Sequence, residues 1–297
     1  MFQIAGHTMG TPEYTVGEAL ELFREIGLDG AEIVVQDGYR CAIPQQAGRQ
    51  ELAEIRNTAD RLGLKIVALT PYYSRFNDLD AGVREAEIQG IRRVIEYAGV
   101  LGAKYIRIYA GNYAQTDTDP DGKKRGCLVD SMRRLGDDAQ QAGVTLVMEN
   151  HFNTMTVSAA DSISVAREIG HPAVGILYDQ ANLTFTGKEA WEEALALQFS
   201  KVCYTHVKDL VFRGGNTGFT SSDVSHPKEE ERNVITKIVG EGVIPWPAIL
   251  QAMKDRGYTG WLSLEYERRW HPQDIPDACI GMKRSAAYLR SCFKQLT

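Results

Sequence analysis

Four short stretches of the chain each end a predicted strand in a side chain that can bind a metal or move a proton. In chain order these residues are Glu149 (in VMENH), Asp179 (in LYDQANL), His206 (in THVKD) and Glu265 (in LSLEYE). Three carboxylates that converge with an imidazole repel one another or lose their solvation unless a cation lies among them. We therefore predict that these four residues bind one divalent metal ion.

The donor set also indicates which metal to expect. Oxygen-rich ligation with a single histidine favours Mn²⁺, with Mg²⁺, Co²⁺ or Zn²⁺ as alternatives, because a structural zinc site prefers thiolates. Each of the four residues taken alone is more often a helix cap, a loop anchor or a satisfied polar group. Their shared position at the ends of successive strands is what favours a metal.

The elements that must position these residues follow a regular alternation of short apolar runs and segments of helical period. Strands are predicted at 2–6, 30–35, 64–70, 103–111, 144–150, 174–179, 201–207 and 260–266, and helices at 16–27, 50–63, 81–101, 124–142, 158–169, 188–199, 246–256 and 276–292. Eight such units predict a single α/β domain over 1–297, a (β/α)8 TIM barrel. An open doubly wound sheet is the alternative, although no GxGxxG or GxxxxGKS loop follows any strand.

One connection departs from this pattern. Residues 208–245 separate the seventh strand from the next helix and include the Gly-, Ser- and Thr-rich stretch FRGGNTGFTSSDVSHP. This loop is far longer than usual, and on a barrel it lies at the face where active sites form. We predict that it covers the substrate; a disordered insertion is the alternative.

Composition narrows the class of protein. The chain has 297 residues, a net charge of −6 and five cysteines without CxxC pairing. The negative charge argues against nucleic-acid or anionic-membrane partners, and the cysteines indicate reduced thiols. Neither a leader peptide nor an apolar run of membrane-spanning length is recognisable, so a cytoplasmic location is expected.

The motifs also resemble a known family. VMENH, LYDQANL, THVKD, VGEGVIPWPAIL (239–250) and GYTGWLSLEYE (257–267) are similar to those of xylose isomerase-like TIM barrels, specifically the sugar phosphate isomerase/epimerase group. That group includes ketose 3-epimerases, hydroxypyruvate isomerases and inosose dehydratases. The resemblance is strongest over 140–290. It implies the same four metal ligands, Glu149 and Glu265 as the catalytic acid/base pair, and a homodimer or homotetramer.

Further polar residues are expected to face the same end of the barrel. We predict substrate contacts for His7, Arg107, His151, Asn182, Lys208, Arg213 and Trp270. Many relatives have a histidine where this chain has Asn182, which cannot carry a proton near neutral pH. This difference leaves the exact substrate open.

The expected activity is isomerisation or epimerisation of a keto-sugar or related polyol ketone through an enediolate, with a bound metal acting as Lewis acid. The same intermediate can expel a β-hydroxyl, so a dehydratase or lyase is the alternative, and a non-catalytic sugar-binding subunit is a third. Apurinic endonucleases share the barrel but use additional histidines. Only six histidines occur here, and none lies at the ends of the third and fourth strands (LTPYY, IYAGN), which argues against a nuclease.

Overall fold

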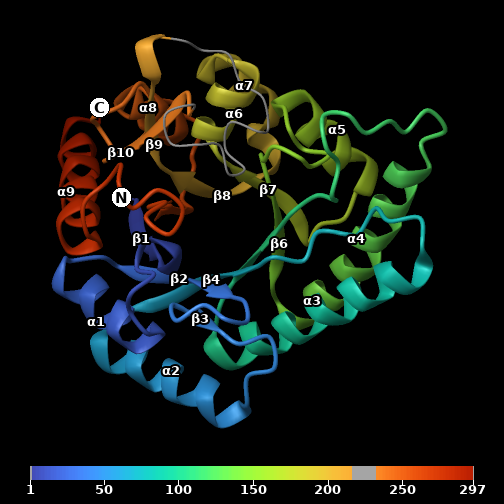
Figure 1. The fold of residues 1–297 in the computed structure, drawn as a ribbon, viewed down its shortest axis with the longest axis horizontal. Helices are drawn as coiled ribbons and strands as arrows, with labels where there is room; N and C mark the ends of the chain where they lie inside the picture. Colours follow the sequence, from blue (N-terminus) through green and yellow to red (C-terminus); the bar gives the residue numbers. More distant parts are fainter. Residues whose placement is uncertain (1, 216–231, 297) are drawn as a thin grey trace.

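The structure, a computed structural model, describes residues 2–215 and 232–296. A closed barrel of parallel strands forms its centre (Figure 1). Its members are β1 (Gln3–His7), β2 (Gly30–Val35), β4 (Lys65–Pro71), β5 (Tyr105–Ile108), β6 (Thr145–Glu149), β7 (Val174–Tyr178), β8 (Val202–Val207) and β11 (Trp261–Leu264). They are hydrogen-bonded in chain order, and β1 closes the ring by pairing with both β2 and β11.

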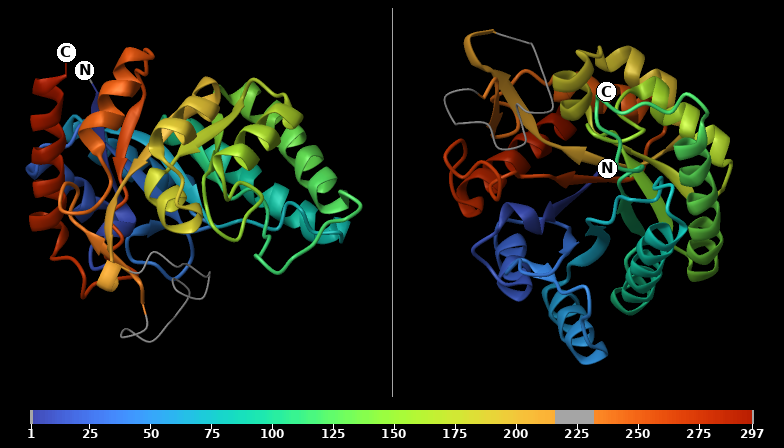
Figure 2. Two further views of the ribbon diagram at one scale, coloured as in Figure 1. Left: turned by 90° about the horizontal axis from the view of Figure 1, so that it is seen from above. Right: turned by 45° about the vertical axis from the view of Figure 1, so that its right-hand side comes forward.

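Helices surround the barrel on its outside, as the views of Figure 2 show. They are α1 (Val16–Glu25), α2 (Arg49–Leu62), α3 (Ala81–Leu101), α4 (Lys123–Ala142), α5 (Ala159–Ile169), α6 (Gln180–Gly187), α7 (Trp191–Gln198), α8 (Trp246–Asp255) and α9 (Ala278–Gln295). Local signals in the sequence fix their ends. Thr15 and Glu18 form a capping box at the start of α1, and Gly63 ends α2 in the left-handed conformation. The predicted (β/α)8 TIM barrel is confirmed.

Side chains alternate along each strand between the helix layer and the barrel interior. In β6, Leu146 and Met148 belong to the large core between strands and helices, whereas Val147 packs inside the barrel with Leu177 and Tyr204. A residue two positions after Val147 therefore also points inward, towards the carboxyl end of the barrel. This parity places Glu149 at the mouth.

The long connection predicted at 208–245 contains regular structure. Strands β9 (Asp209–Phe212) and β10 (Val234–Lys237) pair in an antiparallel hairpin. Residues 216–231 lie outside the described part of the chain, and the predicted covering role of this segment falls largely on them. A short strand β3 (Ala42–Ile43) is also added next to β2. The helix expected at 188–199 is α7, and the additional short helix α6 precedes it.

Candidate metal centre

The four predicted ligands come together at the mouth of the barrel. Glu149 ends β6, Asp179 follows β7, His206 lies in β8 and Glu265 follows β11. These strands are neighbours in the ring, in the order β6, β7, β8 and β11. One ligand-type atom from each residue lies within 4.8 Å of the others, and all four residues are buried.

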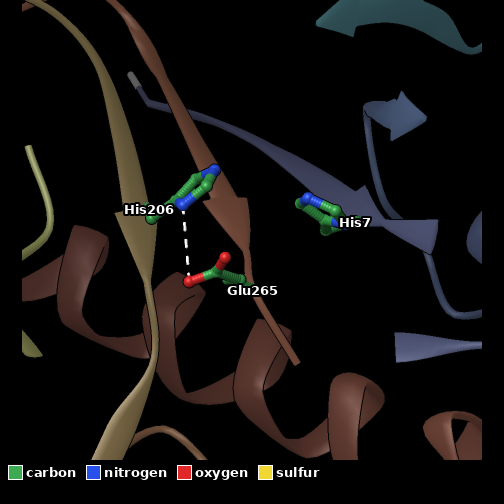
Figure 3. Close-up of side chains that lie close together, drawn as sticks. All are labelled: His7, His206 and Glu265. Atoms are coloured by element: carbon green, nitrogen blue, oxygen red, sulfur yellow. Dashed lines mark ion pairs between the residues drawn. The ribbon is translucent and has the colours of Figure 1, made fainter. Parts of the chain in front are cut away.

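His206 is at the centre of this cluster. Its Nδ1 atom lies 3.5 Å from Glu149 Oε1, 3.9 Å from Asp179 Oδ2 and 3.4 Å from Glu265 Oε2. Figure 3 shows His206 and Glu265 facing each other from adjacent strands. For ligand bonds of about 2.1 Å, two ligand atoms on opposite sides of a cation are about 4.2 Å apart. The spacing of these atoms fits one hard divalent ion.

Two atoms of the cluster support this fit. His206 Nδ1 and Asp179 Oδ2 are buried and make no hydrogen bond within the described structure. Lys208 Nζ lies 3.2 Å from Asp179 Oδ2, but without hydrogen-bond geometry. Buried polar atoms are rarely left without a partner. An imidazole nitrogen and a carboxylate oxygen that face the same point are atoms that a metal ion would satisfy once the nitrogen has lost its proton.

The electrostatics of the cluster are those of a crowded anionic site. Burial raises the pKa of Asp179 to about 7, with Lys208 opposing the effect and Glu265 and Glu149 adding to it. Burial alone would also raise the pKa of Glu265, but Lys208 and His206 more than offset it and hold that pKa well below its usual range. The site therefore needs positive charge, which in the metal-free protein comes from its own side chains.

Lys208, predicted to contact substrate, supplies part of that charge. Its ammonium group lies 2.7 Å from Glu265 and 3.3 Å from Glu267 and is almost fully buried. Trp246 Nε1 donates to the Lys208 carbonyl, which ties α8 to this point of the chain. Lys208 thus links the metal-type cluster to the pocket above it.

That pocket has a volume of about 240 Å³ and opens over the cluster. Of the predicted substrate contacts, Arg107, His151, Lys208 and Trp270 line it, together with aromatic side chains that include Tyr72 and Tyr109. The Arg107 guanidinium lies 3.7 Å from the centre of the Tyr109 ring and 4.9 Å from that of Tyr72. Its Nε and Nη1 atoms are buried without hydrogen-bond acceptors, although Glu149 lies 3.5 Å away.

The other three predicted substrate contacts lie elsewhere. His7 is fully buried, and Asn182 donates from its amide to Glu149 and to the Asn150 carbonyl. Neither residue lines the pocket. Arg213 lies in the exposed turn after β9 and is not among the lining residues. Asn182 thus contacts a predicted catalytic carboxylate, at the position where many relatives have a histidine.

Glu32 was missed by the sequence reasoning. This β2 residue is fully buried inside the barrel, and both of its oxygens lie 3.2 Å from His206 Nε2. Thr70 and Tyr204 also donate to it. The available signal was a carboxylate in the middle of the otherwise apolar strand GAEIVV, at a position whose parity points into the barrel.

The chain belongs to the xylose isomerase-like TIM barrel family, whose model matches residues 20–292. An inosose dehydratase of Geobacillus thermodenitrificans is 27% identical over 141 residues, which are 48% of this chain and 46% of that protein. The match with this curated relative therefore spans about half of its length.

Solved structures share the fold over almost the whole chain. The 3-keto-D-glucoside 4-epimerase YcjR of E. coli aligns with a TM-score of 0.75 at 18% identity, covering 98% of this chain and 100% of that one. A xylose isomerase-like TIM barrel protein from Mycobacterium smegmatis, in complex with magnesium, aligns with a TM-score of 0.76 at 17% identity, covering 100% and 98%. At these identities the likeness concerns the fold alone. In the described part of the chain, no helix is long and apolar enough to cross a membrane.

Proposed function

We propose that this protein is a divalent-metal-dependent isomerase or epimerase acting on a keto-sugar or a related polyol ketone. The observation that carries the proposal is the convergence of Glu149, Asp179, His206 and Glu265 below a pocket of sugar-accommodating size. These four residues would hold the ion, with Mn²⁺ the expected metal. When bound, a divalent ion supplies Lewis-acid polarisation of a carbonyl group.

Glu149 and Glu265 are the proposed acid/base pair. They come from β6 and β11, which are separated in the ring by β7 and β8, so their carboxylates approach the cluster from different sides. Burial and the Glu265 charge act to raise the pKa of Glu149, but His151, His206 and Arg107 leave it below its ordinary value. The pKa of Glu265 is lower still relative to its ordinary value. Both carboxylates are thus ionised at neutral pH, as proton abstraction requires.

The pocket residues are proposed to orient the substrate. Arg107 offers buried donors to a substrate oxygen, and His151 lines the same pocket, with Tyr109 in contact with both. Trp270 and Tyr72 present aromatic surface of the kind that packs against the apolar face of a sugar ring. His7, Asn182 and Arg213 stay predictions as direct substrate contacts, because they lie outside the lining.

A dehydratase or lyase is the second candidate. It is favoured by the similarity to the inosose dehydratase, although the match covers less than half of either chain. The same two carboxylates would then remove a proton next to a ketone and assist loss of a β-hydroxyl as water. Epimerase and dehydratase share the first proton transfer; the epimerase then returns a proton to the carbon, whereas the dehydratase expels the β-hydroxyl as water.

Proton exchange with solvent tests the proposal directly. Keto-hexoses, 3-keto-glucosides, keto-inositols and hydroxypyruvate would be incubated with Mn²⁺-loaded protein in D₂O and followed by NMR. Deuterium next to the carbonyl is expected for at least one ketone, with a new epimer or isomer identifying the first candidate and an unsaturated product the second. If sugars bind but no deuterium exchange occurs with any ketone, the remaining candidate function is a non-catalytic sugar-binding subunit.

The two glutamates should separate metal binding from proton transfer. In Glu149→Gln and Glu265→Gln the amide oxygen can still face the metal, so the Mn²⁺ dissociation constant should rise only modestly. The amide cannot accept the substrate proton, so turnover should fall on the order of 10²-fold or more. Titration calorimetry and steady-state kinetics on the same preparations measure the two effects. A Glu265→Gln protein that keeps its metal and full turnover would exclude the two-carboxylate mechanism.

A further inference from the structure

Glu32 makes a contact across the barrel that the proposed chemistry does not yet use. It projects into the interior from β2, whereas its partner His206 projects from β8, 174 residues later in the chain. Tyr204 precedes His206 by two positions on the same strand and so points the same way, which is why both reach one carboxylate. Thr70 on β4, the strand next to β2, approaches from the other side.

The Glu32 carboxylate is held firmly. Thr70 Oγ1 donates to Oε1 and Tyr204 Oη donates to Oε2 at 3.0 Å, and the residue has no exposed surface. A buried carboxylate with both oxygens bonded has little freedom to turn. It therefore forms a fixed acceptor in the barrel interior, directly below the metal-type cluster.

This acceptor determines the protonation of His206. An ionised carboxylate accepts hydrogen bonds but cannot donate, so the His206 Nε2 atom between its oxygens must carry a proton. Neutral His206 then has its lone pair on Nδ1, the atom that faces Glu149, Asp179 and Glu265. The contact with Glu32 thus selects the tautomer that a metal ligand needs.

The same reasoning decides between two ways of arranging a metal site. His7, His206 and Glu265, drawn in Figure 3, also bring ligand-type atoms within 4.8 Å of one another. However, the Met9 backbone N–H donates to His7 Nδ1, so neutral His7 carries its proton on Nε2. The His7 Nε2 atom lies 3.6 Å from Glu32 Oε1, beyond hydrogen-bond distance. His7 is therefore a further donor near Glu32 and not a ligand.

We propose that Glu32 is the positioning residue of the metal centre: through the His206 Nε2–H it fixes the ring orientation and keeps Nδ1 available to the metal. The inference rests on the proposed function only in requiring that the four-residue cluster binds a divalent ion. Partners of this kind behind a metal-binding histidine typically contribute 10- to 100-fold in metal affinity.

Glu32→Gln is the variant that tests this role. The amide has the shape of the carboxylate, so packing inside the barrel is kept, but it can present either an acceptor or a donor to His206 Nε2 and no longer selects one tautomer. The Mn²⁺ dissociation constant, measured by calorimetry, should rise roughly 10- to 100-fold. Circular dichroism and thermal unfolding, recorded without metal, establish that the unmodified protein and the Glu32→Gln variant are both folded.

Tyr204→Phe is the matched control. It removes one donor to Glu32 and leaves the contact with His206 in place, so the dissociation constant should change by less than about threefold. An equal loss of affinity in both variants would overturn the proposal, because general disturbance of the barrel interior would then explain it. A Glu32→Gln dissociation constant equal to that of the unmodified protein would overturn it as well.

A spectroscopic readout examines the tautomer itself. In protein labelled with ¹⁵N-histidine and saturated with diamagnetic Zn²⁺, His206 is expected to carry its proton on Nε2, with its signals assigned by their loss in His206→Gln. A proton on Nδ1 would overturn the proposal while leaving a metal-binding protein. Absence of metal binding by the unmodified protein would instead defeat the proposed function, and this inference with it.

Discussion

At the scale of single residues, the cluster below the pocket contains buried polar atoms that have no hydrogen-bond partner. His206 Nδ1 and Asp179 Oδ2 are buried without hydrogen-bond partners, while Lys208 lies against two of the carboxylates. Asp179 Oδ1 accepts the Asn182 backbone N–H, and His206 Nε2 lies between the Glu32 oxygens. The residues are thus held in place before any ion arrives, which favours tight and specific coordination.

Metal binding should depend on pH because protons compete for the same atoms. Burial opposes protonation of His206, but Glu265 and Glu32 raise its pKa well above its usual range, and the pKa of Asp179 is about 7. At about pH 6 both groups hold a proton that the ion must displace, whereas at about pH 8 only His206 does. Affinity for Mn²⁺ should therefore increase with pH.

Calorimetry in buffers of different ionisation enthalpy measures this effect. Roughly two protons per ion should be released at the lower pH and roughly one at the higher. An affinity that is independent of pH, with no proton released, would show that the ion binds elsewhere.

At the scale of elements, the alternation along the strands made most of the site predictable. The end of each apolar strand and the ligand-type side chain found there could be read from local sequence alone, and this gave Glu149, Asp179, His206 and Glu265. The role of Glu32 could not be read in this way, because its partners Tyr204 and His206 follow 172 and 174 residues later. The β9–β10 hairpin was missed for a similar reason: its two strands pair across a long intervening segment without a regular apolar pattern.

The hairpin is anchored by Asp209, the last residue of the THVKD motif. Its carboxylate accepts backbone N–H groups of Leu210, Gly240, Gly242 and Ile244. Gly242 lies so close to this carboxylate and to the Leu210 carbonyl that a side chain would not fit. The Asp209 carboxylate thus holds the VGEGV segment in place, which explains why the THVKD and VGEGVIPWPAIL motifs occur together in this chain.

Asp209→Ala should therefore destabilise the fold. Four backbone donors would lose their acceptor, and the free energy of unfolding should fall by about 3 kcal/mol. Urea denaturation measures the change. Asp255→Ala is the control, since that carboxylate is exposed and accepts a hydrogen bond from the Gln251 side chain, not from the backbone of a distant segment. It should change stability by less than about 0.5 kcal/mol. Equal stability of the two variants would contradict the anchoring role.

At the scale of the whole molecule, the barrel brings residues from distant parts of the chain to one mouth. Glu32 and Glu265 lie near opposite ends of the sequence, yet both contact His206, because β1 closes the ring between β2 and β11. The eightfold alternation of strand and helix was predictable, since each unit is local in sequence. The identity of the substrate was not predictable from the sequence, because the pocket is lined by residues from many strand–helix connections at once.

We propose that one divalent ion at this mouth is required for proton transfer next to a ketone. The most direct test uses protein stripped of metal by a chelator and incubated in D₂O with the ketones named above, before and after Mn²⁺ is restored. We predict no deuterium in any ketone without metal, and incorporation next to the carbonyl of at least one ketone once Mn²⁺ is present. Exchange at an equal rate in the stripped protein, or no exchange with any ketone after metal is restored, would contradict a metal-dependent proton transfer at this site.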